Sequence, residues 1–195
     1  MRNNMNWFGL AGGLTIVVLI AISLFVPWWQ LTVGDDLVKA NASPINTNFN
    51  FAGTSFTIPL IWALNVASII FLSAGGIAML VYSVSPSKSY SEKLLGFSYK
   101  KPLYAILLFV VVLILITLLV KSVFNFEVPF LGSIETTLPA EITNETNISV
   151  LMSANFVWPF WLAVLATTLC IMAKFYHKKT GAPLSKALTE NMPPA

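Results

Sequence analysis

Four long stretches of this chain carry no charged residue, and this feature constrains the fold more than any other. The stretches run from Asn3 to Gly34, Ala40 to Ser87, Pro102 to Val120 and Thr146 to Ala173. A helix needs about 20 apolar residues to cross the hydrocarbon core of a bilayer, and each stretch holds an apolar run of close to that length or more. Backbone groups in lipid must be hydrogen-bonded within the segment, which favours helices. The sequence therefore predicts four membrane-spanning helices.

The composition agrees with this prediction, because 56% of the 195 residues are hydrophobic and only 10% are charged. The most apolar parts of the stretches place the helices at about 7–28, 56–82, 102–120 and 156–173. Pro59 and Pro159 fall in the first turns of the second and fourth helices, where a missing N–H costs nothing. Thr54 or Ser55, and Asn155, are the expected caps of these two helices.

The basic residues indicate the orientation of the chain. Nine of the eleven Lys and Arg residues and two acidic residues fall before the first helix, between the second and third helices, or after the fourth, which gives this side a net charge of +7. The opposite side carries two basic and six acidic residues, a net charge of −4. Because cytoplasmic loops are enriched in Lys and Arg, both termini are expected in the cytoplasm of a multi-pass plasma-membrane protein. The high isoelectric point follows from this topology and gives no indication of nucleic-acid binding.

This topology divides the chain into four parts. We expect a first helical hairpin at 1–84 with an outer β-rich loop at about 30–55, a basic cytoplasmic loop at 85–101, a second helical hairpin at 102–173 with an outer loop at about 122–155, and a cytoplasmic tail at 174–195. Val26-Pro27-Trp28 and Phe56-x-x-Pro59 in the first hairpin are matched by Val128-Pro129-Phe130 and Phe156-x-x-Pro159 in the second. A parallel repeat and two unrelated hairpins with prolines at their helix ends both explain this similarity.

The outer loops contain strand patterns. Residues 45–51 alternate apolar or β-branched residues with asparagine, which predicts a half-buried strand. Gly34-Asp35-Asp36 suits a tight turn between strands at 31–33 and 37–38. In the second loop, residues 134–138 and 142–150 are rich in Ile and Thr and could add strands. The expected fold class is an all-α membrane bundle of four transmembrane helices with a small extracellular β-rich domain formed by the two outer loops.

Aromatic residues of the first outer loop have two interpretations. Trp28, Trp29, Phe49 and Phe51 either pack the β-rich domain onto the helices or form its contact face. Packing is the preferred interpretation, since an exposed aromatic patch invites aggregation.

Three N-glycosylation sequons begin at Asn41, Asn144 and Asn147, and all three fall in the outer loops. They suit an N-glycosylated surface protein, although loops rich in Asn, Thr and Ser also produce such triplets by chance. Cys170 is the only cysteine, so no intrachain disulfide can hold the outer domain together. Glycans without disulfides favour an archaeal cell surface.

The residues needed for common chemistries are missing. No charged residue lies inside the expected spans, which argues against a proton or ion pathway. His177 is the only histidine, and paired ligands for haem or copper are absent. We therefore expect no enzyme activity, no cofactor and no metal site. The acidic pairs Asp35 and Asp36, and Glu141 and Glu145, are interpreted as solvated surface rather than as a cation site.

Small and polar residues within the spans are assigned to helix packing. Gly9-x-x-x-Gly13 in the first helix and the Gly75-Gly76 pair in the second provide surfaces where backbones can approach closely. They can serve packing within the chain or a dimer interface, and the first is preferred. Asn65 is the most costly of the polar residues to bury, and an interhelical hydrogen bond is a better explanation for it than transport.

The chain resembles the claudin-like four-span membrane proteins. The resemblance rests on four helices with cytoplasmic ends, two β-rich outer loops, and Trp28-Trp29-x-Leu31 as the nearest match to the tryptophan-containing first loop of that family. The chain departs from the family because the cysteine pair of the first loop is missing. The resemblance implies a shared architecture and suggests an adhesive role, although a fold alone does not transfer function.

Two functions follow from these observations. The leading hypothesis is a non-enzymatic protein of the cell surface that contacts itself, a surface layer or a larger membrane assembly through its outer domain. The alternative is an accessory subunit of a respiratory or transport complex whose chemistry belongs to other chains. The expected partners are the lipid bilayer, other membrane or surface proteins, and a second copy of the chain.

Overall fold

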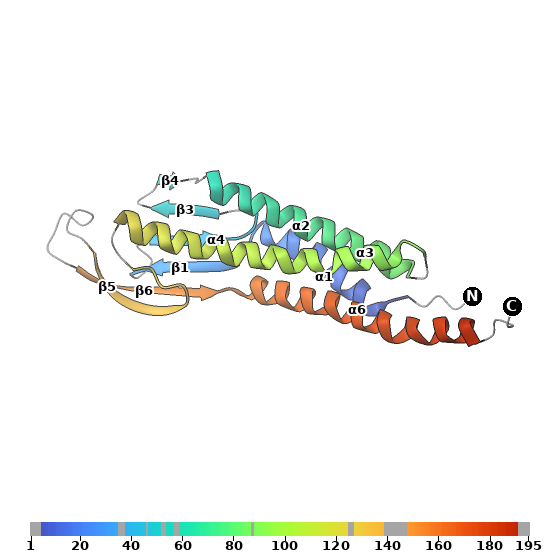
Figure 1. The fold of residues 1–195 in the computed structure, drawn as a ribbon. Coiled ribbons are helices and arrows are strands. Elements are labelled where there is room, and N and C mark those ends of the chain that lie inside the picture. Colours follow the sequence, from blue (N-terminus) through green and yellow to red (C-terminus); the bar gives the residue numbers. More distant parts are fainter. Residues whose placement is uncertain are drawn as a thin grey trace.

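The structure is a computed structural model that describes residues 5–34, 38–45, 47–51, 54–56, 59–86, 88–124, 127–138 and 148–190. In chain order the elements are α1 (Trp7–Ser23), β1 (Trp29–Val33), β2 (Val38–Ala42), β3 (Thr47–Phe51), β4 (Thr54–Phe56), α2 (Pro59–Val84), α3 (Ser91–Ser98), α4 (Lys100–Phe124), β5 (Gly132–Leu138), β6 (Ile148–Phe156) and α6 (Trp158–Glu190). The helices form an elongated bundle, and the strands form a sheet at one end of it (Figure 1). α1 begins and α6 ends at the end of the bundle far from the sheet (Figure 1).

The strands form one six-stranded antiparallel sheet in the order β4-β3-β2-β1-β6-β5. β1 pairs with β2 on one side and with β6 on the other, so Trp29 lies opposite both Ala42 and Phe156. The outer segments of both helical hairpins therefore contribute to a single sheet. The strand predicted at 45–51 is confirmed by β3 over 47–51, while Ile45 is not part of it and residue 46 lies outside the described residues. The predicted hairpin is confirmed by the pairing of β1 with β2.

β5 and β6 confirm that the second outer segment also forms strands, while residues 142–147 of the predicted region lie outside the described residues. The two outer segments differ in their described pairing. β5 and β6 pair directly with each other, whereas β1 and β4 are separated by two strands. Among the described residues, the two segments with similar sequence motifs therefore pair their strands differently.

The central strand β1 has one buried and one half-buried face. In β1, Trp29, Leu31 and Val33 are buried, while Gln30 and Thr32 are half-buried, as the period of two in a strand requires. The buried face shares one apolar core with the buried residues Phe109, Val112, Leu113 and Ile116 of α4. This contact is possible because α4 extends beyond the other helices and runs along the sheet (Figure 1).

The described chain contains three helical segments that are long and apolar enough to cross a membrane. They are Pro59–Val84 with 26 residues, Ser91–Leu119 with 29 residues across α3 and most of α4, and Trp158–His177 with 20 residues in α6. α1 is also apolar but has only 17 residues. The protein is thus mostly helical, with three candidate spans and a small antiparallel sheet.

Several predicted helix boundaries are wrong. α1 ends at Ser23 rather than near Trp28. Pro27 lacks the N–H that a longer helix would use and disfavours a helical conformation at the residue before it. α2 and α6 begin later than expected, at Pro59 and Trp158, because the chain is still in β4 or β6 just before them.

For the same reason, the prediction that Thr54, Ser55 and Asn155 cap these helices is wrong, since all three lie in strands. The two prolines do occupy first turns, with Pro59 as the first residue of α2 and Pro159 as the second of α6.

Helical structure also extends into segments expected to be loop or tail. α4 covers Lys100–Phe124, longer at both ends than the predicted 102–120. α3 lies within the segment 85–101, where Leu95 and Ser98 are buried and Glu92 is exposed. α6 continues to Glu190 instead of stopping near Ala173. The predicted helices ended at the first charged residues of the flanking segments. Charged residues do not prevent a helix from continuing beyond its apolar part.

Candidate functional site

Trp28 joins the helical bundle to the sheet. Its side chain is fully buried, and its indole Nε1 donates a hydrogen bond to Ser23 Oγ at 2.7 Å. Its backbone N–H donates to the carbonyl of Ala42 and its own carbonyl accepts from Val157 N–H, both at 2.9 Å. Trp28 therefore connects the end of α1, strand β2 and the start of α6 through three hydrogen bonds.

Rings from two other helices surround this joint. The Trp28 ring lies edge-on to Phe109 of α4 at 5.1 Å and to Phe160 of α6 at 6.3 Å between centroids. Phe160 stacks on Phe156 at 4.2 Å, and Phe156 meets Phe130 at 5.6 Å. Edge-to-face aromatic pairs of this kind contribute beyond the area they bury. The row of rings makes the end of the bundle and the base of the sheet one packed unit.

Trp29 fixes the second outer segment to the first. It is almost fully buried, and its indole Nε1 donates to the carbonyl of Phe130 at 3.0 Å. Both tryptophans thus pack the sheet onto the helices and are not part of an exposed contact face. Phe49 and Phe51 lie in β3, where Phe49 pairs with Ala40 and Phe56, and their side chains are outside the described part of the structure.

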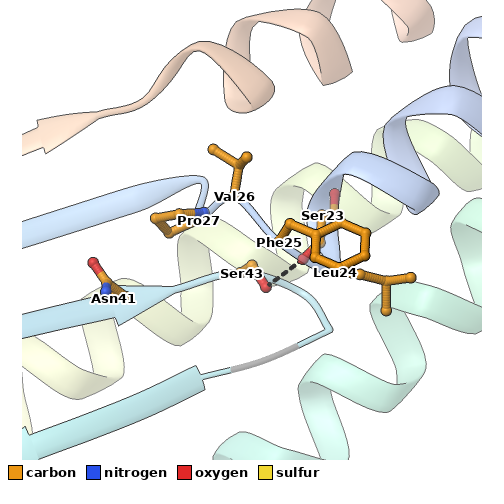
Figure 2. A pocket seen from close by; sticks show the side chains of 7 residues that line it. All are labelled: Ser23, Leu24, Phe25, Val26, Pro27, Asn41 and Ser43. Carbon is orange, nitrogen blue, oxygen red and sulfur yellow. Dashed lines mark hydrogen bonds between the residues drawn. The ribbon is translucent and has the colours of Figure 1, made fainter.

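A pocket of about 160 Å³ lies beside this joint, lined by Ser23, Leu24, Phe25, Val26, Pro27, Asn41 and Ser43 (Figure 2). The Ser43 hydroxyl donates to the carbonyl of Ser23 at 3.3 Å, which ties β2 to the end of α1 across the pocket (Figure 2). Sites for small molecules usually measure ~300 to 1,000 Å³. This pocket is too small for such a ligand and is interpreted as part of the joint.

The polar face of the sheet carries amides and hydroxyls. Gln30 lies opposite Asn41 on β2 and Asn155 on β6, so the three amides occupy one row across adjacent strands. Ser153 lies next to this row and accepts hydrogen bonds from Asn155 Nδ2 at 3.2 Å and from Ser133 Oγ at 3.3 Å. This part of the face is polar and uncharged, which suits hydrogen bonding to a neutral partner.

The edge strand β5 has one side without a pairing strand in the described structure. Its seven residues pair with β6 from Gly132 opposite Ala154 to Leu138 opposite Ile148. Ser133, Ile134 and Glu135 are exposed. The backbone N–H and C=O groups on the open side of an edge strand can pair with a strand from another chain.

The three sequons have different surroundings. Asn41 lies in β2, inside the sheet, with its Oδ1 buried and without a hydrogen-bond partner in the described structure. Ala42 and Ser43 of the same sequon are buried. Asn144 and Asn147 lie outside the described residues.

Asn6 closes the opposite end of the bundle, and sequence analysis did not identify it. Its side chain is buried and donates from Nδ2 to Tyr82 Oη and to the carbonyl of Ala173, both at 3.0 Å. Its Oδ1 accepts from Gly9 N–H at 3.1 Å and so caps α1. The only sequence signal was an asparagine directly before the apolar run, which is a common helix cap.

The predicted packing glycines lie at contacts between helices. A Cβ on Gly13 would be 2.7 Å from Leu80 Cγ, and one on Gly76 would be 2.7 Å from Ile16 Cγ2. Gly9 faces Ser83 of α2 and Ala173 of α6, whereas Gly75 faces Pro102 of α4. Within the described chain, these four glycines therefore mediate contacts between α1, α2, α4 and α6.

The remaining candidates are also part of the packed bundle. Asn65 of α2 and Cys170 of α6 are buried, and Cys170 contacts the backbone position of Gly12. The ring of His177 lies edge-on to Tyr82 at 5.6 Å. No group of three or more metal-ligating side chains occurs among the described residues.

Comparison with known protein families gives no match, and no curated protein matches the sequence.

Proposed function

We propose that the chain is a non-enzymatic integral membrane protein of the cell surface that binds other proteins through its sheet. In this proposal four helices cross the membrane, both termini are cytoplasmic, and the sheet lies outside the cell. The proposed architecture resembles that of the claudin-like proteins and lacks the cysteine pair of their first loop. The observation that carries the proposal is the edge of β5, which has no pairing strand among the described residues, on a sheet fixed to the bundle by Trp28.

The fourth span of the proposal is α1. Its 17 residues equal the shortest length, about 17 residues, of a helix that can cross a bilayer. The apolar chain continues through Leu24 to Val26, where hydrogen bonds to the carbonyl of Ile22 close a further turn. Leu14, Val17 and Val18 are exposed on the outside of the bundle, which suits contact with lipid.

The charge distribution supports the orientation. The segments at the end of the bundle far from the sheet carry a net charge of +7, and the segments on the sheet side carry −4. Basic residues collect on the cytoplasmic side of membrane proteins. The sheet and its edge strand β5 then face the outside.

Cysteine labelling tests the topology, because the single native cysteine, Cys170, is buried within the bundle. Ser133→Cys places a thiol on exposed β5, and Tyr90→Cys places one beside α3 at the other end of the molecule. A membrane-impermeant maleimide should label intact cells at position 133 and not at position 90. Labelling at position 90 without lysis would refute the orientation.

Cross-linking tests the role of the edge. Glu135→Cys introduces a thiol on the open edge, and Asn155→Cys introduces an exposed one on β6 as the matched control. If two copies pair edge to edge, disulfide-linked dimers should form at position 135 and not at 155. Dimers at neither position, together with stable co-purification of redox or transport subunits, would favour the accessory-subunit function instead.

A further inference from the structure

Three lysines and a tyrosine converge where α3 meets α4. Lys174 of α6 donates a hydrogen bond from Nζ to Tyr99 Oη at 2.8 Å, and its Nζ lies 4.3 Å from the centre of the Tyr99 ring. Lys100 Nζ lies 5.9 Å from the same ring centre. Lys101 Nζ lies among the rings of Phe71, Phe97 and Tyr104, at 4.5, 4.9 and 5.9 Å. Tyr99, Lys100, Lys101 and Lys174 are called the lysine cluster.

The positive charge of this cluster is not neutralised by the described chain. None of the three ammonium groups forms an ion pair with a described carboxylate. Their contacts are ring faces and one hydroxyl, and each such cation–π contact contributes only about 0.5–1 kcal/mol at an exposed site. The ammonium groups of Lys100 and Lys174 therefore retain donors for an anionic ligand.

The cluster lies on the side of the bundle and not at its tip. A Cβ on Gly75 would meet Lys101 Cβ at 3.0 Å and Pro102 Cδ at 2.7 Å, so the start of α4 lies beside Gly75 of α2. α2 continues nine residues further to Val84, which is about 13 Å along its axis. Phe97 and Tyr104 are exposed beside the lysines. In the orientation given under the proposed function, on which this inference rests, the place lies beside the inner leaflet, and a lipid headgroup reaches it from within that leaflet.

We propose that the lysine cluster binds the phosphate group of an anionic lipid in the inner leaflet. Lys100 and Lys174 donate hydrogen bonds to phosphate oxygens. Because Tyr99 Oη already accepts from Lys174, the tyrosine hydroxyl donates its proton to the same phosphate. The rings of Phe97 and Tyr104 contact the acyl chains next to the headgroup. Basic pockets between helices on the cytoplasmic side recognise lipid headgroups through this chemistry.

The test compares lipid retention by the full-length protein in nanodiscs of phosphatidylcholine containing a minor fraction of phosphatidylglycerol. Bound phosphatidylglycerol is counted by native mass spectrometry. The double variant Lys100→Gln and Lys174→Gln should lose about 25-fold in affinity, since each lysine near an anionic surface contributes about five-fold. The matched control, Lys88→Gln and Lys93→Gln, removes the same charge from exposed positions outside the cluster and should retain the lipid.

Each other outcome is decisive. Equal loss in both double variants would refute a specific site and leave only diffuse attraction to the basic side. Displacement of the lipid by millimolar inorganic phosphate would overturn the lipid assignment in favour of a free anion. If the glutamine variant does not fold, two further variants provide the test. The double variant Lys100→Arg and Lys174→Arg should retain the lipid, whereas Tyr99→Phe should weaken lipid binding. Lipid retention unchanged by Tyr99→Phe would contradict the proposed geometry.

Discussion

The two ends of the helical bundle are closed in different ways. At the end far from the sheet, the amide of Asn6 joins α1 to Tyr82 of α2 and Ala173 of α6. At the sheet end, the indole of Trp28 fills the space between α1, α4 and α6, while its backbone groups begin the pairing that continues into the sheet. Among the described residues, neither closure uses an ion pair.

The difference indicates where the stability should reside. Hydrogen bonds between membrane helices contribute little on average, about 0.6 kcal/mol, because the separated helices find other partners. Burial of a large aromatic side chain has no such substitute, and its removal leaves a cavity. We therefore expect the sheet end to depend on packing and to be more sensitive to substitution than the Asn6 end.

The largest effect is expected for Trp28→Ala. Removing this fully buried side chain should lower the free energy of unfolding by about 3–5 kcal/mol, measured by reversible denaturation in mixed micelles. The control is Trp158→Ala, which removes an exposed tryptophan and should change the free energy of unfolding little. A loss at Trp28 no greater than that at Trp158 would remove the proposed contrast between the two ends.

The next effect concerns packing near the Asn6 end. Gly13→Ala would place a Cβ 2.7 Å from Leu80 Cγ, and relief of this overlap should cost about 1–3 kcal/mol. Gly96→Ala is the matched control, since nothing lies within 4 Å of the added Cβ. Thermal unfolding should give a lower melting temperature for Gly13→Ala than for Gly96→Ala. Equal melting temperatures would show that α1 and α2 are not as tightly packed as the structure indicates.

A smaller effect is expected for Asn6→Ala. The substitution removes the bonds to Tyr82 and Ala173 and the cap on Gly9 N–H, and should cost about 1–2 kcal/mol. Thr15→Ala serves as control, because the Thr15 hydroxyl bonds only to the carbonyl of Ala11 in its own helix. The free energy of unfolding is measured by denaturation. A larger loss for Asn6→Ala than for Trp28→Ala would show that the Asn6 end is the more sensitive one.

The smallest effect concerns the ion pair at the C-terminal end of α4. Lys121 Nζ donates to Glu127 Oε1 at 2.6 Å, and this bond lowers the pKa of Glu127 below its usual value near 4.5. The contribution to stability is therefore present above that usual pKa and is lost as the pH falls through the lowered pKa. Both side chains are exposed, so a melting curve should hardly register the loss.

Carboxyl titration by NMR should show the lowered pKa directly, and Lys121→Gln should return it toward 4.5. An unshifted Glu127 in the unsubstituted protein would contradict the pair.

Local sequence patterns predicted much of the secondary structure. The charge-free stretches located the apolar helices, and the alternation at 45–51 located β3, because both signals depend only on neighbours along the chain. The errors occurred at the ends of elements. Thr54 and Ser55 resemble helix caps in sequence, yet pairing with β3 holds them in a strand. Sheet pairing depends on residues distant in sequence, so a local cap signal cannot reveal it.

The candidate site could be predicted only in part. Trp28 and Trp29 stood out by residue type, but the same sequence suited both packing and an exposed contact face. Only the surrounding rings of Phe109 and Phe160, which are more than 80 residues away, establish that Trp28 is buried. Asn6 was missed for a similar reason, since its partners Tyr82 and Ala173 come from two other helices.

The sequence by itself determined that the chain is rich in apolar helices, that basic residues gather on one side, and that the outer segments contain strands. These properties depend only on composition and on the pattern of neighbouring residues along the chain. The tertiary structure decided that one sheet combines strands from both helical hairpins, that Trp28 joins this sheet to three helices, and that Lys100 and Lys174 meet at Tyr99. Such placements arise because burial and hydrogen bonding are satisfied between residues far apart in the chain, and no local pattern encodes those partners.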